Sequence, residues 1–243
     1  MTDTTTALVT GANKGIGREV AAQLADLGMD VLLASRDPRR GAAAAAELGP
    51  RVHPVTLDVT DRTSVLSAAR RIEEGFGRLD VLVNNAGIGG DLAAQSPSVV
   101  ELSVVREVFE TNVFGVISVT TAMLPLLARS PAARIVNVSS GLGSLARMTD
   151  PEDYVATRPA MAAYVPSKTA LNSLTVQYAK ELRSRGILVN AADPGPSATD
   201  FTTAFPGLTR TAADGAAVVV RLATLPDDGP TGGFFDEHGP VPW

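Results

Sequence analysis

TGANKGIG, residues 10–17, lies between the apolar run Ala7–Val9 and a segment with helical periodicity, Gly15–Leu27. Glycine adopts backbone conformations that other residues avoid, and it lets a ligand approach the main chain closely. The N-terminus of the helix that follows offers free N–H groups and a positive dipole end. By itself the spacing also fits an ordinary glycine turn. Its place between a strand and a helix favours a dinucleotide site instead.

Outward from this stretch, apolar segments alternate with helical segments along the whole chain. The apolar runs do not alternate with polar residues, which is typical of parallel strands buried on both faces. The expected strands are Ala7–Val9, Val31–Leu33, Val52–Leu57, Val81–Val83, Ile135–Val138, Ile187–Val189 and Gly233–Phe235. The expected helices are Gly15–Leu27, Arg39–Leu48, Arg62–Phe76, Val99–Ala128, Ala162–Ser184 and Thr211–Leu225.

This order predicts an α/β fold with a single doubly wound, Rossmann-type domain over residues 1–243. Its sheet is expected to be mostly parallel, with about seven strands. Two irregular segments, residues 142–161 and 196–210, follow strands at their carboxyl ends, where open α/β sheets bind ligands. We therefore expect both segments to face a small-molecule substrate.

Composition excludes several other classes of protein. The net charge is −5, and no basic tract exceeds Arg39-Arg40 or Arg70-Arg71, so no nucleic-acid partner is expected. The chain has no cysteine and only two histidines, so we expect no metal site. The polar start of the chain carries no signal peptide. The uncharged stretch Thr111–Ala128 fits a buried helix better than a membrane span. The expected location is the cytoplasm.

The end of the second expected strand indicates which dinucleotide is bound. It has Arg36 where an NAD site usually has a carboxylate for the ribose 2′-hydroxyl, and an arginine there suits a 2′-phosphate. Lys14 adds a second positive charge from the glycine loop. Asp37 is interpreted as solvated or as a helix N-cap. The two cations favour NADP(H), although two unrelated surface charges would give the same pattern.

Tyr164 and Lys168 are the strongest candidates for chemistry. They are four residues apart near the start of an expected helix, so they share one face. A phenol has a pKa near 10, and a neighbouring ammonium is expected to lower it. Tyr164 would then donate a proton to a carbonyl oxygen as hydride arrives at the carbon. The alternative is a tyrosine–lysine pair on a helix surface.

Together these features resemble the short-chain dehydrogenase/reductase family, and within it the NADPH-dependent carbonyl reductases. The resemblance spans nearly the whole chain. The motifs that carry it, in order, are Thr10–Gly17, Asp58-Val59, Asn84-Asn85-Ala86-Gly87, Asn112, Ser140, Tyr164-Val165-Pro166-Ser167-Lys168 and Pro194-Gly195 with Thr199.

The resemblance implies a role for each motif. Ser140, three residues before Gly143, would hydrogen-bond the substrate oxygen, whereas Ser139 would point the other way. Asn112 would help to hold a water beside Lys168, or would be a buried residue bonded to backbone. Lys168 would also hold the nicotinamide ribose. Cofactor contacts are expected from Gly11, Asn13, Lys14, Gly15, Ile16, Gly17, Arg36, Asp58, Val59, Asn85, Ala86, Gly87, Tyr164, Lys168, Pro194, Gly195 and Thr199.

The sequence departs from the compact family pattern in one place. Ser140 and Tyr164 are 24 residues apart, a longer link than compact members have. The extra chain, within Leu145–Met161, is expected to form a lobe or short helix beside the site. It would obstruct the helix pairing of compact oligomers, which favours a monomer. The loop after Thr199 is short, which suggests an open pocket for small hydrophobic carbonyls and quinone-like compounds.

The expected function is NADPH-dependent reduction of a ketone or aldehyde, with Tyr164 as general acid. Two alternatives remain open. One is a dedicated ketoreductase or alcohol dehydrogenase of secondary metabolism. The other is a non-catalytic NADP(H)-sensing protein, which typically keeps the glycine loop but loses the tyrosine or the lysine.

Overall fold

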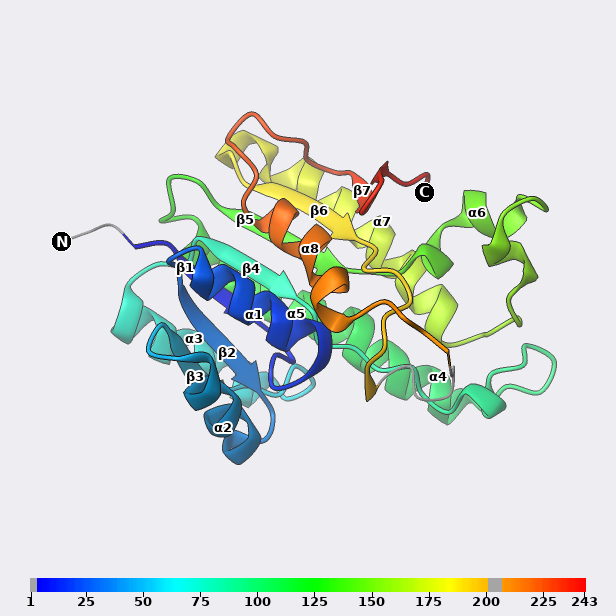
Figure 1. The fold of residues 1–243 in the computed structure, drawn as a ribbon, viewed down its shortest axis with the longest axis horizontal. Coiled ribbons are helices and arrows are strands. Elements are labelled where there is room, and N and C mark those ends of the chain that lie inside the picture. The colour runs from blue at the N-terminus through cyan, green and yellow to red at the C-terminus, as the bar shows by residue number, and fades with distance from the viewer. Residues whose placement is uncertain (1–3, 201–206) are drawn as a thin grey trace.

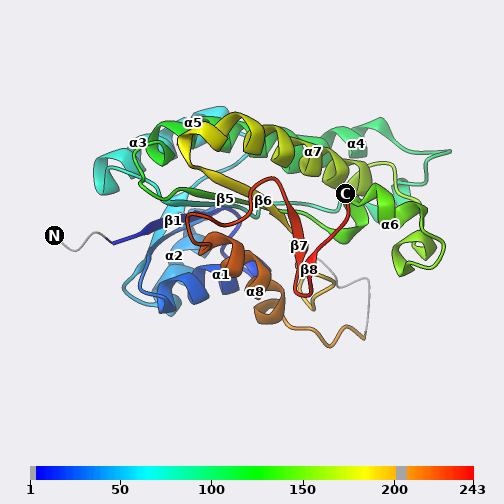
Figure 2. The ribbon, with the colours of Figure 1, turned by 90° about the horizontal axis from the view of Figure 1, so that it is seen from above.

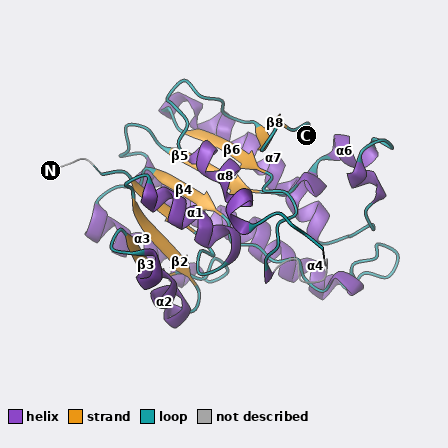
Figure 3. Cartoon of the chain, in the orientation of Figure 1, coloured by secondary structure: helices purple, strands orange, loops and turns teal. Residues whose placement is uncertain are grey.

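The computed structural model describes residues 4–200 and 207–243. Its strands form one eight-stranded sheet in the order β3-β2-β1-β4-β5-β6-β7-β8. All neighbouring strands are parallel except the last pair, β7 and β8. The strands and helices alternate along the chain, as the ribbon in Figure 1 and the cartoon in Figure 3 show.

The strands are β1 (Thr6–Val9), β2 (Asp30–Ser35), β3 (Val52–Thr56), β4 (Val81–Asn84), β5 (Arg134–Val138), β6 (Leu188–Ala192), β7 (Phe234–Asp236) and β8 (Gly239–Pro240). The α-helices are α1 (Gly15–Asp26), α2 (Pro38–Leu48), α3 (Arg62–Phe76), α4 (Leu102–Phe109), α5 (Gly115–Leu127), α6 (Leu145–Thr149), α7 (Tyr164–Leu182) and α8 (Ala212–Ala223).

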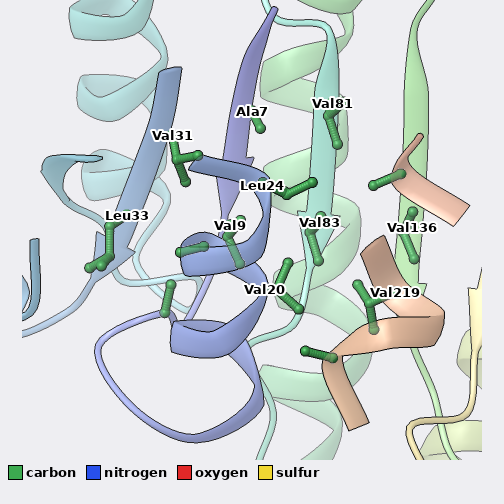
Figure 4. Close-up of a cluster of buried hydrophobic side chains, with 14 of the residues drawn as sticks. Ala7, Val9, Val20, Leu24, Val31, Leu33, Val81, Val83, Val136 and Val219 are labelled. Atoms are coloured by element: carbon green, nitrogen blue, oxygen red, sulfur yellow. The ribbon is translucent and has the colours of Figure 1, made fainter. Parts of the chain in front are cut away.

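The helices cover both faces of the sheet. Figure 2 shows α1, α2 and α8 on one side and α3, α5 and α7 on the other. On the first side, Val20 and Leu24 of α1 and Val219 of α8 pack on strand residues such as Val9 and Val83 (Figure 4). These side chains are fully buried, so the apolar runs of the sequence form the two-sided core of a doubly wound sheet. The predicted fold class is confirmed.

The sheet differs from the prediction in two details. It has eight strands, because the two-residue strand β8 pairs antiparallel with β7 at the edge. Strand β6 is also longer than the apolar run that predicted it, because it continues through Asn190, Ala191 and Ala192. Asn190 satisfies its buried amide by donating to Pro230 O at 2.7 Å and accepting from Gly233 N at 3.0 Å.

The uncharged stretch Thr111–Ala128 forms part of a long helical run. A single π-helical turn, Glu110–Phe114, joins α4 to α5. The run Leu102–Leu127 is long and apolar enough to cross a membrane, and half of its most apolar window is buried in the protein. Val119, Met123 and Leu127 are fully buried against the sheet, so α5 has the burial of a core helix.

The strand order identifies the carboxyl edge of the sheet as the expected ligand-binding edge. Strand β1 lies between β2 and β4, so the chain reverses its winding direction between β1 and β4. Ligands of open α/β sheets bind at such a reversal. The glycine loop follows β1, and the segments after β4, β5 and β6 end at the same edge.

Candidate active site

The glycine loop is held in a conformation that excludes larger residues. Gly11 and Gly15 have φ values of 63° and 57°. A Cβ at Gly11 would lie 2.9 Å from Ala86 Cα, and one at Gly17 would lie 2.3 Å from Asn85 Nδ2. Asn85 in turn donates to the Thr10 carbonyl at 2.8 Å. The segment after β4 therefore packs directly on the loop, and Asn85 braces it.

The N-terminus of α1 suits an anionic group. The helix begins at Gly15, and the residue before it, Lys14, makes no side-chain cap. The first amides of a helix have no intrahelical acceptor, so an uncapped N-terminus is a favourable place for a pyrophosphate. Asn13 and Ile16 belong to this same turn. The residues present fit a bound dinucleotide.

Arg36 is exposed and directly follows β2, at the carboxyl edge of the sheet. Asp37 does not compete for this position, because its carboxylate accepts hydrogen bonds from Arg39 N and Arg40 N and caps α2. The prediction that Asp37 is a helix N-cap is therefore confirmed. Arg36 is therefore the charged residue next to the end of β2 that stays available for a ligand.

Lys14 of the glycine loop is paired with a carboxylate of the segment that follows β6. Its ammonium forms an ion pair with Asp200 Oδ2 at 2.9 Å, and both side chains are exposed. Thr199, next to Asp200 in the segment after β6, has its side chain 3.7 Å from a Cβ built at Gly15. The start of the expected loop 196–210 therefore lies over the glycine loop, whereas its residues 201–206 lie outside the described chain.

Ser140 and Tyr164 meet at the carboxyl end of β5. Their side chains are hydrogen-bonded to each other. Ser140 Oγ also accepts from Leu142 N at 3.2 Å, which caps a 3-10 turn at Gly141–Gly143. Ser139 points away, as expected, and donates to Asn172 Oδ1 at 2.5 Å. The neighbouring serines are thus clearly distinguished, and only Ser140 faces the tyrosine.

Lys168 and Asn112 complete this cluster. Lys168 is 5% exposed and donates from Nζ to Val138 O at 2.9 Å. That Nζ is 5.7 Å from the centre of the Tyr164 ring. Asn112, in the π-helical turn, accepts from Ile88 N at 2.9 Å and donates to Ser167 Oγ at 3.0 Å. Both side chains border Gly87, since a Cβ there would be 3.3 Å from Asn112 Oδ1 and 3.6 Å from Lys168 Nζ.

The pKa of Tyr164 is raised, whereas a lowered value was expected from the neighbouring Lys168. Removal from water raises the pKa of Tyr164 to about 12, although its hydrogen bond with Ser140 opposes the rise. Burial also lowers the pKa of Lys168 to about 8. Desolvation disfavours the charged form of each group, so it acts in opposite directions on a phenol and an ammonium. The phenol is therefore protonated at neutral pH.

The other residues predicted to contact the cofactor follow strands that end at the same edge of the sheet. Asp58 follows β3, and its carboxylate accepts a hydrogen bond from Thr60 N at 3.0 Å. Val59 packs against Gly115, where a Cβ would lie only 2.9 Å from Val59 Cγ2. Pro194 and Gly195 follow β6, and Gly195 has a φ of 69°. Thr199, further along the segment after β6, lies against the glycine loop. The segments after β1, β3, β4 and β6 therefore all lie at the carboxyl edge of the sheet.

The chain between Ser140 and Tyr164 forms α6 and a 3-10 turn at Tyr154–Thr157, in agreement with the expected short helix. The C-terminus braces it: Ala146 N donates to Trp243 O at 2.9 Å, and Ser144 Oγ donates to Pro242 O at 2.6 Å. Figure 2 shows α6 beside the start of α7 and the C-terminus. The insertion is thus held by the C-terminal residues that follow β8.

Gln95 is a residue of the site region that sequence reasoning missed. It is fully buried, and its Oε1 accepts from the backbone N–H of Tyr164 at 2.9 Å. Its Nε2 donates to Gly89 O at 2.6 Å. Helix α7 has no side-chain cap from its own N-cap residue, Ala163, so Gln95 supplies this contact from a distant loop.

Asp193 and Arg147 were missed as well. Asp193 directly follows β6 and is buried, and its Oδ2 is 3.7 Å from Arg147 Nη1. A signal was available for Asp193, because it is a carboxylate at the carboxyl end of an expected strand, beside Pro194-Gly195. The sequence gives no comparable signal for Arg147.

Comparisons with known proteins identify the family and agree with the fold. The model of the short chain dehydrogenase family matches residues 5–207. Salutaridine reductase from Papaver bracteatum is 35% identical, covering 95% of this chain and 93% of the relative. NADPH-bound carbonyl reductase from chicken fatty liver has a TM-score of 0.87 at 29% identity, covering 99% of both chains. The NADH complex of 3-ketoacyl-(acyl-carrier-protein) reductase from Brucella melitensis has a TM-score of 0.84 at 28% identity, covering 96% of both chains.

Proposed function

Because this chain belongs to the short-chain dehydrogenase family, we propose that it reduces a ketone or aldehyde with NADPH and that Tyr164 is the proton donor. Members of the family are oxidoreductases that use a nicotinamide cofactor, and the similar proteins include a carbonyl reductase. The observation that carries the proposal is the hydrogen bond between Ser140 and Tyr164 beside the buried Lys168.

The protein's own residues would bind the cofactor in an extended crevice. The uncapped N-terminus of α1 would hold the pyrophosphate, and Asp58 and Val59 would lie near the adenine. Pro194, Gly195 and Thr199 would cover the nicotinamide end. When bound, reduced nicotinamide supplies the hydride that adds to the carbonyl carbon.

The substrate oxygen would accept hydrogen bonds from Ser140 Oγ and Tyr164 Oη. As the carbonyl carbon gains hydride, negative charge develops on this oxygen, and both donors stabilise it. Tyr164 then transfers its proton to the oxygen, which completes the alcohol. The raised pKa of Tyr164 keeps this proton in place at neutral pH, and an alkoxide is basic enough to take it.

Lys168 would act on both partners of the reaction. Its ammonium would stabilise the phenolate that Tyr164 becomes, and it would hydrogen-bond the nicotinamide ribose. The bond to Val138 O fixes Nζ at the end of β5. Asn112 borders Gly87 together with Lys168, where it would help to hold a water near this ammonium.

NADPH is preferred over NADH in this proposal because of Arg36. A guanidinium pairs well with a 2′-phosphate, and Asp37 is already engaged in capping α2. Lys14 would join the 2′-phosphate only after leaving Asp200. The NADPH complex among the structural neighbours supports this preference, and the NADH complex shows that the fold accommodates either cofactor.

The substrate would be a small hydrophobic carbonyl compound. One relative is named for the reduction of salutaridine and one neighbour is a carbonyl reductase, so both a dedicated ketoreductase and a general reductase are represented. The test is oxidation of NADPH by a panel of ketones, aldehydes and quinones, compared between the wild type and Tyr164→Phe.

We also propose that the protein is a monomer in the cytoplasm. The insertion packs beside the N-terminus of α7, where it would obstruct pairing through that helix. Light scattering at assay concentration tests this, since a tetramer would contradict it.

A further inference from the structure

The carboxylate of Asp193 ties together three segments of the site. Its Oδ1 accepts from Gly195 N at 3.0 Å, and it also accepts from the backbone N–H of Gly141. A Cβ at Gly141 would lie 2.5 Å from Asp193 Oδ2 and 2.7 Å from Arg147 Nη1. The turn that follows Ser140 is therefore folded directly onto this carboxylate and its arginine.

Arg147 connects Asp193 to the insertion. Its guanidinium lies between two carboxylates: Nε donates to Asp153 Oδ2 at 2.9 Å, and Nη1 is 3.7 Å from Asp193 Oδ2. The Arg147 and Asp193 side chains are 15% and 7% exposed, so water screens this pair little. Asp153, Arg147 and Asp193 thus form a continuous row of alternating charges from the insertion to the end of β6.

The register of the sheet places Asp193 near Lys168. Lys168 Nζ donates to Val138 O, and Val138 is the partner of Ala192 across β5 and β6. Ser139 N donates to Ala192 O at 2.7 Å, and the next residue of β6 is Asp193. The ammonium of Lys168 donates to a neutral carbonyl, which carries no charge to balance it, so a nearby carboxylate affects the charge state of the lysine.

We propose that Asp193 is a positioning residue of this site: oriented by Arg147, its carboxylate holds the turn that carries Ser140 and is the counter-charge of the Lys168 ammonium. The catalytic meaning of this assignment rests on the proposed function, whereas the charge relationship does not. The insertion would thereby contribute to the chemistry through Arg147, and not only to the shape of the pocket.

The electrostatics around Asp193 have the sign this requires. Burial lowers the pKa of Lys168, and the Asp193 carboxylate opposes that change. Burial raises the pKa of Asp193 itself, while Gly195 N, Gly141 N and Arg147 favour its ionised form. Asp236 of β7 opposes ionisation of Asp193, and Asp153 in the insertion pairs with Arg147. On α7, the titratable groups affected by Asp193 are Tyr164 and Lys168, and its negative charge raises the pKa of each.

The composition of the chain allows a direct test. The sequence has three lysines, Lys14, Lys168 and Lys180. With lysine labelled at Cε with ¹³C, each gives a separate titration curve by NMR, and Lys14→Arg and Lys180→Arg identify the Lys168 signal. In Asp193→Asn, we expect the midpoint of Lys168 to fall by about one pH unit, the effect of removing one nearby buried charge.

Asp153→Asn is the matched control, because it removes the other carboxylate that faces Arg147 while Asp193 stays in place. It should move the Lys168 midpoint by less than about a third of a unit. If Asp193→Asn does not fold, the double variant Asp193→Asn with Arg147→Gln replaces the pair by neutral groups. A smaller fall of the midpoint is then expected.

An unchanged Lys168 midpoint in the Asp193 variants, or an equal fall in Asp153→Asn, would overturn the inference. In turnover, the fall of kcat/KM at alkaline pH should begin at lower pH in Asp193→Asn, whereas a purely structural role would lower activity equally at every pH. The lysine titration needs no substrate, so a wild type without turnover would refute the proposed function and still leave this test decisive.

Discussion

The backbone N–H of Tyr164 donates a hydrogen bond of 2.9 Å to Oε1 of Gln95, a residue 69 positions earlier in the chain. The Gln95 backbone carbonyl also accepts from Ala162 N at 2.9 Å. Gln95 therefore fixes both the start of α7 and the segment that leads into it. The position of the proposed proton donor depends on a buried amide far from it in sequence.

Gln95→Met should lower kcat with little change in the dissociation constant of NADPH. Methionine matches the volume but leaves the Tyr164 N–H without its acceptor, so the phenol is held less well and kcat should fall about tenfold. Steady-state kinetics and NADPH fluorescence titration measure the two effects. Gln23→Met is the control, because Gln23 bonds to Ala213 O away from the site. An equal loss in both variants would contradict a positioning role for Gln95.

Ser140→Ala should reduce kcat by about 100-fold, since it removes one of two donors to the developing oxyanion. Ser139→Ala is the matched control, because Ser139 bonds to Asn172 and not to Tyr164. That control should cost about 1 kcal/mol of unfolding free energy and leave kcat within about threefold. If the two alanine variants exchanged these effects, the assignment of Ser140 would be incorrect.

Arg36→Ala should weaken NADPH selectively. Loss of a charge-assisted contact with the 2′-phosphate is expected to raise KM for NADPH about tenfold while KM for NADH stays the same. Arg39→Ala, an exposed arginine one turn further on, should change neither value. A wild type with a higher kcat/KM for NADH than for NADPH would refute the cofactor assignment itself.

Burial of Lys168 should make the fold less stable near neutral pH. Its pKa is about 8 in the folded protein and about 10.4 in an unfolded chain, so the unfolded state binds more protons between these values. Stability from this group therefore rises as pH increases from about 8 to about 10.4. Lys168→Met should gain on the order of 2 kcal/mol at pH 7, lose this pH dependence and lose activity. Urea unfolding of the wild type and Lys168→Met at several pH values measures this difference in stability. A Lys168→Met variant less stable than the wild type at pH 7 would contradict the prediction.

Local sequence spacing was sufficient to predict the glycine loop and the fold class. Apolar runs indicate parallel strands. The loop between β1 and α1 is formed by consecutive residues, so its glycine spacing can be read directly from the sequence. The spacing of four residues between Tyr164 and Lys168 likewise places both side chains on one face. The edge strand β8 was missed because a two-residue pairing leaves no pattern in sequence.

Other features of the site depend on contacts between distant segments, so sequence alone did not give them. Gln95 and Arg147 act only because the fold brings them to α7 and to Asp193. The pKa of Tyr164 was predicted in the wrong direction because the distance to Lys168 and the extent of burial follow from packing. The catalytic roles of Asn112, Ser140, Tyr164 and Lys168 stay predictions.

The most direct test compares NADPH oxidation by the wild type, Tyr164→Phe and Tyr178→Phe over aromatic aldehydes, α-dicarbonyls, quinones and bicyclic ketones. Tyr178 lies on the same helix, outside the site, and serves as the matched control. We expect turnover by the wild type and Tyr178→Phe, and a loss of about 1,000-fold in Tyr164→Phe with NADPH binding retained. Comparable turnover by Tyr164→Phe, or tight NADPH binding by a wild type that reduces no carbonyl, would contradict the proposed function.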